Sequence, residues 1–202
     1  MIRVAVLDDH PAVRVGLDAI LAAEPDLVSV GFAADEEEVW PLLRRTRPSV
    51  IVLDVHHPGR DGLTLCLRIK SELQPPAVIL YSAATPPALV VAATVAGADA
   101  VVSKASTALA LLETIRAVAH APRTRPTISP QMRAEAAAQL DPFDHAVLAM
   151  RLAGDTPTDI GATLGLSVAA VADRIATIVA SLARPRPTSP PAGGLVPAGS
   201  AA

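Results

Sequence analysis

Short runs of aliphatic and β-branched residues alternate with longer helical patterns over the first 119 residues of the chain. The short runs are IRVAVL, LVSVGFA, SVIVLDV, AVILYS and AVVSK, and a helical pattern follows each of them. Five such β-then-α units predict a parallel sheet, and right-handed crossovers place its helices on both faces. We therefore expect an α/β fold over residues 1–119, doubly wound and flavodoxin-like, with strand order 2-1-3-4-5.

The rest of the chain has a different pattern. Residues 120–139 mix Pro, Arg and Thr before an Ala-rich stretch, and they predict a linker with a short helix in its second half. In residues 140–183, Pro-containing helix starts and Gly stops alternate, as in Thr156–Pro157 followed by Gly165. We expect a small all-α helix-turn-helix domain there and a disordered Pro/Gly-rich tail over residues 184–202.

Composition narrows the class of protein. Only 2% of the 202 residues are aromatic, so the core must consist mostly of Val, Leu, Ile and Ala. Cys66 is the single cysteine, which excludes an internal disulfide and a Cys-based zinc cluster, and we expect it to be a buried apolar residue. No apolar stretch approaches the roughly 18 residues that cross a membrane. We therefore expect a cytoplasmic protein without membrane contact.

Carboxylates stand where two of the predicted strands end. Asp8 and Asp9 follow the first strand, and Asp54 ends the third. Because these strands are neighbours in the order 2-1-3-4-5, the three side chains should converge at one edge of the sheet. Adjacent carboxylates repel unless a positive group lies among them, and Mg²⁺ suits a shallow, loop-lined site of this kind. The pattern predicts a Mg²⁺ site.

Two further polar residues stand at the ends of the remaining central strands. The fourth strand ends in Ser82 and the fifth in Lys104, and a hydroxyl and an ammonium can bind the oxygens of a phosphoryl group. Asp54 would then be the nucleophile that accepts the group. Each residue alone has an ordinary alternative as a helix cap, a loop former or a solvated side chain. Their joint position favours a phosphoryl-accepting site.

The stretches LDDHPAVRVGL and DVHHPGRDG, together with Ser82 and the strand AVVSK, resemble the receiver domain of bacterial two-component response regulators of the LuxR type (NarL/FixJ subfamily). The resemblance implies that a sensor histidine kinase phosphorylates Asp54. It also implies that Asp9 and Asp54 bind Mg²⁺ directly, that the backbone carbonyl of His56 is a third ligand, and that Asp8 acts through water.

Two positions depart from the pattern of that family. Val101 stands where the family usually has an aromatic residue whose rotamer follows phosphorylation, and His57 stands where Met is common. The first departure leaves open a regulator that binds DNA without phosphorylation control, although the complete set of acids, Ser and Lys argues against it.

The segment LDPFDHAVLAMRLAGDTPTDIGATLGLSVAAVADRIATIVASL resembles the helix-turn-helix output domain of the same family. Its charge departs from a DNA-binding pattern, because residues 139–183 contain two Arg against five Asp. The candidate DNA contacts are Ser167, Ala169, Ala170 and Arg174, of which only Arg174 can bind a guanine or a phosphate through a charged group.

The sequence is compatible with two functions. The first is a transcription regulator that is phosphorylated by a sensor histidine kinase, forms a homodimer and binds DNA. The alternative is a receiver protein whose degenerate helix-turn-helix module binds a protein partner or dimerises. The apolar segment PALVVAATVAG, with Val90, Val91 and Val95, is a candidate contact surface.

An enzymatic function is not expected. Aspartyl-phosphate hydrolases of the haloacid dehalogenase type need a second acid two residues after the nucleophile, and the chain has His56 there. The sequence contains neither a P-loop nor a dinucleotide-binding glycine fingerprint.

Overall fold

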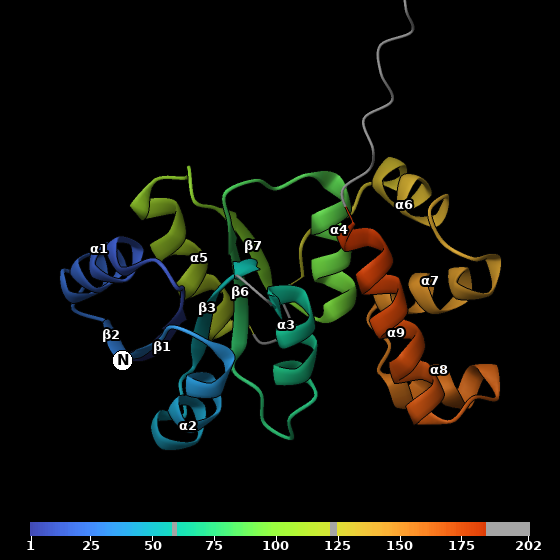
Figure 1. Ribbon diagram of the computed structural model, residues 1–202, viewed down its shortest axis with the longest axis horizontal. Helices are drawn as coiled ribbons and strands as arrows, with labels where there is room; N and C mark the ends of the chain where they lie inside the picture. The colour runs from blue at the N-terminus through green and yellow to red at the C-terminus, as the bar shows by residue number, and fades with distance from the viewer. Residues whose placement is uncertain (58–59, 122–124, 185–202) are drawn as a thin grey trace, which may run out of the picture.

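A computed structural model of the chain describes residues 1–57, 60–121 and 125–184 (Figure 1). Its main sheet is parallel, with the order β2-β1-β3-β6-β7, which confirms the predicted order 2-1-3-4-5. The five strands are β1 (Ile2–Leu7), β2 (Leu27–Ala33), β3 (Val50–Asp54), β6 (Ala77–Ser82) and β7 (Ala100–Ser103). A small antiparallel pair, β4 (His56–His57) and β5 (Arg60–Asp61), follows β3.

Helices cover both faces of the sheet, as the β-then-α pattern predicts. One face carries α1 (Pro11–Ala22) and α5 (Ala108–His120), and the other carries α2 (Glu36–Thr46), α3 (Gly62–Lys70) and α4 (Pro87–Ala96). Successive side chains of a strand point to opposite faces, so Val52 and Leu53 of β3 contribute to different cores. Both cores are aliphatic, in agreement with the low aromatic content.

The C-terminal helices include α8, which begins after Thr156 and ends before Gly165 as the sequence indicates. They are α6 (Pro130–Ala137), the short 3₁₀ helix η1 (Pro142–Asp144), α7 (His145–Ala153), α8 (Pro157–Leu164) and α9 (Val168–Ala183). Thr156 and Asp159 form a capping box at the start of α8, and Ser167 caps α9 by accepting a hydrogen bond from the Ala170 N–H. Gly165 ends α8 in a left-handed conformation that favours glycine. The tail predicted to be disordered lies outside the described residues from residue 185 onward.

The apolar core of the C-terminal helices is continuous with one core of the α/β part. Helix α9 packs against α4 and α3, and α6 and α7 also pack against α4. The buried residues of α9, among them Ile175 and Ile178, belong to the same apolar cluster as Val91 and Val95 of α4. Helix α4 is therefore covered by the sheet on one side and by the C-terminal helices on the other.

This packing corrects the expectation for the PALVVAATVAG segment. Val91 and Val95 are fully buried and Val90 is half-buried. The apolar surface of α4 does serve as a contact surface, but its partner is α9 of the same chain. An all-apolar helix needs burial on more than one side, and the C-terminal helices supply it.

A buried arginine joins the two parts of the chain. The guanidinium of Arg151, on α7, donates from Nε (3.2 Å) and Nη2 (2.9 Å) to the carbonyl oxygen of Val95 near the end of α4. Its Nη1 donates to the carbonyl oxygen of Asp155 at 3.0 Å. Arg125 lies alongside and donates to the carbonyl oxygens of Arg151 and Gly154. Burial, and then the charge of Arg125, lower the pKa of Arg151.

Among the described residues, no single helix has the length and hydropathy needed to cross a membrane; α8 and α9 reach that hydropathy only as a pair, bent by 111° at the turn between them.

Candidate functional site

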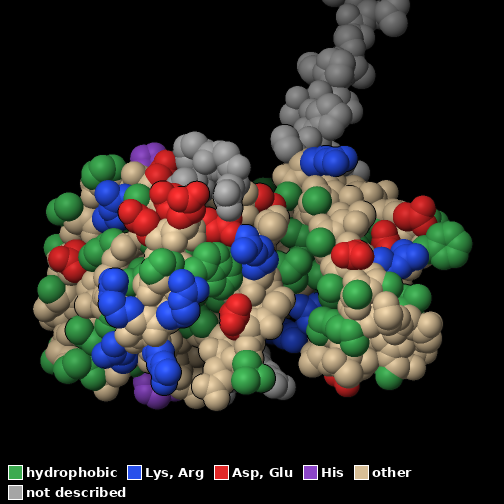
Figure 2. All heavy atoms as spheres, turned by 60° about the horizontal axis from the view of Figure 1, so that its bottom comes forward, with side chains coloured by type: hydrophobic (Ala, Val, Ile, Leu, Met, Phe, Trp, Pro, Cys, Tyr) green, Lys and Arg blue, Asp and Glu red, His purple; other side chains and the backbone are tan. Residues whose placement is uncertain are grey.

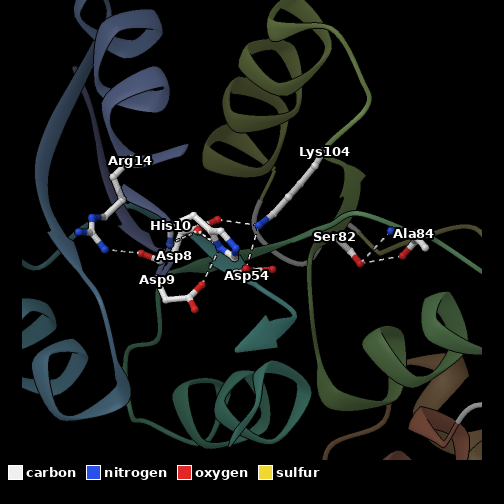
Figure 3. A network of polar contacts seen from close by, with 8 residues as sticks. All are labelled: Asp8, Asp9, His10, Arg14, Asp54, Ser82, Ala84 and Lys104. Carbon is white, nitrogen blue, oxygen red and sulfur yellow. Dashed lines mark hydrogen bonds and ion pairs between the residues drawn. The ribbon is translucent and has the colours of Figure 1, made fainter. Parts of the chain in front are cut away.

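The predicted acidic residues converge at the carboxyl edge of the sheet (Figure 3). Strands β1 and β3 pair in register from Val4 and Val50 onward, so Asp8 lies just beyond β1 beside Asp54 at the end of β3. Lys104 follows β7 and reaches across this edge, with its Nζ 2.7 Å from Asp8 Oδ2 and 2.8 Å from Asp54 Oδ2. The strand order thus places two carboxylates and an ammonium in direct contact.

Burial makes these charges interdependent. Asp8 and Asp54 are 1% and 3% exposed, and the Lys104 side chain is 20% exposed. Burial of the ammonium lowers the pKa of Lys104, but hydrogen bonds and charges from Asp54 and Asp8 outweigh that effect, so its pKa is raised overall. Lys104 is therefore a firmly held cation between two acids, which explains how adjacent carboxylates are tolerated at the end of a buried strand.

Asp9 and His10 complete a group of possible metal ligands. Ligand atoms of Asp8, Asp9, His10 and Asp54 all lie within 4.8 Å of one another. Asp9 Oδ1 is enclosed and receives no hydrogen bond from the described residues, although His10 Nδ1 lies 2.7 Å away. An enclosed carboxylate oxygen beside two further carboxylates suits a hard cation that takes oxygen ligands. The residues therefore fit Mg²⁺, as the sequence predicts for Asp8, Asp9 and Asp54.

The fourth predicted metal ligand lies in the short hairpin after β3. His56 pairs with Asp61 across β4 and β5, which keeps its backbone close to the end of β3. The hairpin closes back on the strand through a hydrogen bond from the Gly62 N–H to the Val55 carbonyl oxygen. The role of the His56 carbonyl as a ligand stays a prediction. The residues at the tip, Pro58 and Gly59, lie outside the described residues.

Ser82 lies at the same edge but points elsewhere (Figure 3). Its side chain is fully buried, and Oγ donates to the carbonyl oxygen of Ala84 at 2.7 Å. The backbone is nevertheless tied to the site, because the Lys104 N–H donates to the Ser82 carbonyl oxygen at 2.7 Å. A hydroxyl that binds a phosphoryl group on Asp54 has to rotate away from Ala84 first.

Three residues of this edge were not predicted from the sequence. His10 donates its backbone N–H to Asp8 Oδ1 at 2.9 Å, and Arg14 Nη1 donates to the Asp8 carbonyl oxygen at 2.8 Å. Together they fix the loop that carries Asp8 and Asp9. Gly62 allows a close approach, since a Cβ there would overlap the Asp54 carbonyl oxygen. The signal for Gly62 was present in the Asp-Gly pair, which marks a tight turn.

The candidate DNA contacts lie at the start and in the middle of α9. Ser167 and Ala169 are exposed and Ala170 is half-buried. Arg174 does not project freely: its Nη1 forms an ion pair with Asp144 Oδ1 at 2.7 Å, and Asp144 is 7% exposed. The ion pair fastens α9 to η1, which gives Arg174 a structural partner that the sequence did not indicate.

Comparisons with known proteins agree with this geometry. A family model described as the response regulator receiver domain matches residues 4–116. The transcriptional regulatory protein LiaR of Bacillus subtilis (strain 168) is 30% identical over 195 residues, which cover 90% of this chain and 91% of LiaR. The structure of a two-component response regulator of the LuxR family from Aurantimonas sp. SI85-9A1 is 29% identical, with a TM-score of 0.58 over 67% of this chain and 94% of that chain.

Some relatives are enzymes, but the similarity to them is partial. A protein-glutamate methylesterase/protein-glutamine glutaminase of Nitrosospira multiformis is 39% identical over 88 residues. These residues cover 44% of this chain and 24% of the enzyme. The similarity over nearly the full length is instead to a transcriptional regulatory protein.

Proposed function

The chain belongs to the response regulators that carry a receiver domain, and from that premise we propose that it is a transcription regulator controlled by phosphorylation of Asp54. The observation that carries the proposal is the convergence of Asp8, Asp9, Asp54 and Lys104 at one edge of the sheet. A sensor histidine kinase is the proposed phosphodonor. The cytoplasmic location and the absence of an enzymatic activity, both expected from the sequence, belong to the same proposal.

Asp54 is placed to accept a phosphoryl group. One of its carboxylate oxygens attacks the phosphorus of a phosphohistidine, the new P–O bond forms as the P–N bond breaks, and the imidazole leaves. Lys104 already contacts Asp54 Oδ2 and is placed to donate to the phosphoryl oxygens. Asp9, Asp54 and the His56 carbonyl, with Asp8 through water, would hold Mg²⁺, and the chemistry that the ion would supply is neutralisation of negative charge at the site.

Ser82 provides the proposed switch. In the structure its hydroxyl donates to Ala84, in the loop that leads into α4. A phosphoryl group on Asp54 offers a charged acceptor, which binds a hydroxyl more strongly than a carbonyl does. Rotation of Ser82 toward it would release Ala84 and loosen the loop before α4. Because α9 packs on α4, this change would reach the C-terminal helices.

The C-terminal helices are the proposed DNA-binding module, and residues 120–139 the linker that precedes it. Ser167, Ala169, Ala170 and Arg174 are the proposed contacts, with the base or phosphate contact made by Arg174. The ion pair with Asp144 engages Nη1, so the remaining guanidinium N–H groups are those proposed to reach DNA. Similarity over nearly the whole chain to a transcriptional regulatory protein supports this output.

Phosphorylation is tested with the purified full chain, Mg²⁺ and acetyl phosphate, followed by intact-protein mass spectrometry. We expect a gain of one phosphoryl group that hydroxylamine removes, because an acyl phosphate is a reactive carboxylic derivative. Asp54→Asn should gain none, whereas Asp61→Asn, which alters a cap of α3, should still gain one. Equal phosphorylation of Asp54→Asn would refute Asp54 as the acceptor.

DNA binding is tested by selection from random duplexes at low salt, with and without the phosphodonor. We expect an enriched site of two half-sites whose binding strengthens with phosphodonor only when Asp54 is present. Arg174→Gln should weaken that binding while an exposed control on the opposite part of the chain, Glu72→Gln, should not. If the folded, phosphorylated protein enriches no DNA sequence, the proposal that the C-terminal helices bind DNA is refuted.

A further inference from the structure

Tyr81 is the single tyrosine of the chain and lies at the edge of the sheet that carries the candidate site. It directly precedes Ser82 on β6 and pairs with Asp54 at the end of β3. On its other side it pairs with Val102 of β7. Its carbonyl oxygen accepts a hydrogen bond from the Val55 N–H at 3.2 Å. The backbone of Tyr81 is therefore fixed against the strand end that carries Asp54.

The side chain of Tyr81 lies on the face of the sheet that α1 and α5 cover. It is half-buried and packs against the apolar cluster between that face and the two helices. The other side chains of this cluster are aliphatic, except that of Phe32 on β2. Among the described residues, the phenol hydroxyl of Tyr81 forms no hydrogen bond. Burial raises the pKa of Tyr81, so the phenol is neutral near pH 7 and the residue offers its surroundings an uncharged ring.

The ring of Tyr81 lies beside the ammonium of Lys104. Lys104 Nζ is 5.7 Å from the centre of the ring, within the distance at which an aromatic ring attracts a cation. The same nitrogen is 2.7 Å from Asp8 Oδ2 and 2.8 Å from Asp54 Oδ2. The ammonium has three N–H donors, and the two carboxylates can engage two of them. Two carboxylates and one ring therefore surround the cation of the site.

Another lysine of the chain shows that a paired ammonium does not need a ring. Figure 2 shows Lys and Arg side chains that stand out from the surface of the α/β part, whereas the side chains of Lys104 and Lys70 are each only 20% exposed. Lys70 Nζ pairs with Asp99 Oδ2 at 2.8 Å. Among the described residues, no aromatic ring lies over Lys70. The ring beside Lys104 is therefore not a general requirement for enclosing a lysine in this fold.

Phosphoryl transfer gives a reason for a ring at this position. Lys104 contacts Asp54 Oδ2, and the proposed reaction turns the carboxylate of Asp54 into an acyl phosphate, so this contact changes as the P–O bond forms. Asp8 alone would draw the ammonium toward itself. A neutral ring is not altered by the reaction, and it can hold the ammonium while its partner changes from a carboxylate to a phosphoryl oxygen. Such positioning is the main contribution of a protein to phosphoryl transfer.

We propose that Tyr81 is a positioning residue for the phosphorylation of Asp54, and that its ring holds the ammonium of Lys104 where the incoming phosphoryl oxygens arrive. The inference rests on the proposed phosphorylation of Asp54 and adds to it a residue that acts through Lys104. The ring carries this role and the hydroxyl does not, so phenylalanine can replace Tyr81 and an aliphatic side chain cannot.

The first experiment measures the rate at which the full chain is phosphorylated by acetyl phosphate with Mg²⁺, by intact-protein mass spectrometry. Tyr81→Leu removes the ring but keeps an apolar side chain, and it should react about fivefold more slowly than wild type, which corresponds to about 1 kcal/mol. Tyr81→Phe keeps the ring and should react within about twofold of wild type. The matched control, Phe32→Leu, replaces a ring in the same apolar cluster and should leave the rate unchanged.

The second experiment tests the contact between ring and ammonium without phosphorylation. Incorporation of 3-fluorotyrosine gives one ¹⁹F resonance, because Tyr81 is the single tyrosine. Lys104→Met removes the charge beside the ring and should shift this resonance. Lys70→Met removes an equally exposed lysine that is also paired with an acid, and it should leave the resonance in place. Phosphodonor and Mg²⁺ should shift the resonance of the wild type but not that of Asp54→Asn, because Lys104 changes partner only when Asp54 is phosphorylated.

Three results would overturn the positioning role. Tyr81→Leu and Phe32→Leu could react at equal rates, which would reduce Tyr81 to a core side chain. Tyr81→Phe could be as slow as Tyr81→Leu, which would assign the effect to the hydroxyl. Lys104→Met could leave the resonance in place, which would show that the ring does not sense the ammonium. A wild-type chain that gains no phosphoryl group would refute the acceptor role of Asp54 as well, so phosphorylation of the wild type tells the two failures apart.

Discussion

Replacement of Arg151 by Met tests whether the junction between α4 and α7 holds the C-terminal helices in place. Arg151 is 8% exposed, and its guanidinium provides two donors to the Val95 carbonyl oxygen and one to that of Asp155. Methionine keeps the unbranched stem and fills a similar volume, so Arg151→Met removes the hydrogen bonds without opening a large cavity.

The size of the effect follows from what each carbonyl loses. The N–H groups of Ala98 and Asp99, which follow α4, donate to Ala93 and Val78, so they do not supply the Val95 carbonyl. Without Arg151 this carbonyl would be buried and unpaired, which costs about 1–3 kcal/mol. The Asp155 carbonyl oxygen can accept a hydrogen bond from water instead, because Asp155 is half-exposed. Arg151→Met also removes a buried positive charge, and this gain offsets part of the loss in the free energy of unfolding. We expect the free energy of unfolding to fall by about 2 kcal/mol.

The assay is urea denaturation of the full chain with hydrogen exchange on peptides from α4 and α9. A loss of about 2 kcal/mol corresponds to a fall of roughly 4–8 °C in Tm for a chain of this size. Exchange should rise in both helices, because α4 and α9 share one apolar cluster. Arg133→Met, an exposed change on α6, is the control and should stay within about 0.5 kcal/mol of wild type. If Arg151→Met and Arg133→Met have equal stability and equal hydrogen exchange, Arg151 does not hold the C-terminal helices on α4.

Three further predictions concern single groups. The Arg116 hydrogen bond lowers the pKa of Asp26 from 3.8 to about 2, so this pair stabilises the fold fully above pH 3.8 and loses that effect as pH falls toward 2. In an NMR titration, Arg116→Met should return the pKa of Asp26 toward 3.8, and an unchanged pKa would contradict the assignment. Burial raises the pKa of Cys66 to about 12, so a thiol reagent should label Cys66, by mass spectrometry, only after unfolding. Labelling of the native protein at the unfolded rate would show that the thiol is accessible. Gly62→Ala places a Cβ against the Asp54 carbonyl oxygen and should cost about 1–3 kcal/mol in thermal unfolding and slow phosphorylation. If Gly62→Ala keeps the stability and the phosphorylation rate of the wild type, the turn can rearrange to accept the Cβ.

The site was predictable because topology decides where strand ends meet. Once five β-then-α units fix the order of the sheet, Asp8 and Asp54 must lie side by side, and the structure places them there with Lys104 between them. Arg14 and His10 were not predictable in the same way. Their contacts with Asp8 depend on the conformation of one loop and on the first turn of α1, which periodicity does not specify.

The packing of the C-terminal helices against α4 and α3 was the largest feature that the sequence did not predict. The apolar pattern of α4 indicated a second contact surface, but a pattern on one helix does not say which surface covers it. The apolar face of α9 is used both by its own neighbours α7 and α8 and by α4. Arg174 shows the same limit, because its ion pair with Asp144 requires η1 to lie across α9.

The structure also bounds how far phosphorylation alone can move the C-terminal helices. Val101 is half-buried against the core and is too short to act as a rotating aromatic, so the proposed link from Asp54 toward α4 is the Ser82 hydroxyl, which is bonded to Ala84 in the structure. One such hydrogen bond contributes about 0.5–1.5 kcal/mol, which changes a population ratio by about 2- to 12-fold. The junction at Arg151 is worth about 2 kcal/mol by the same reasoning, apart from the shared apolar cluster. On this reasoning the proposed switch at Ser82 is too weak to release α9 from α4 by itself, and a ligand that binds only the released helices, for which DNA is proposed, would complete the balance.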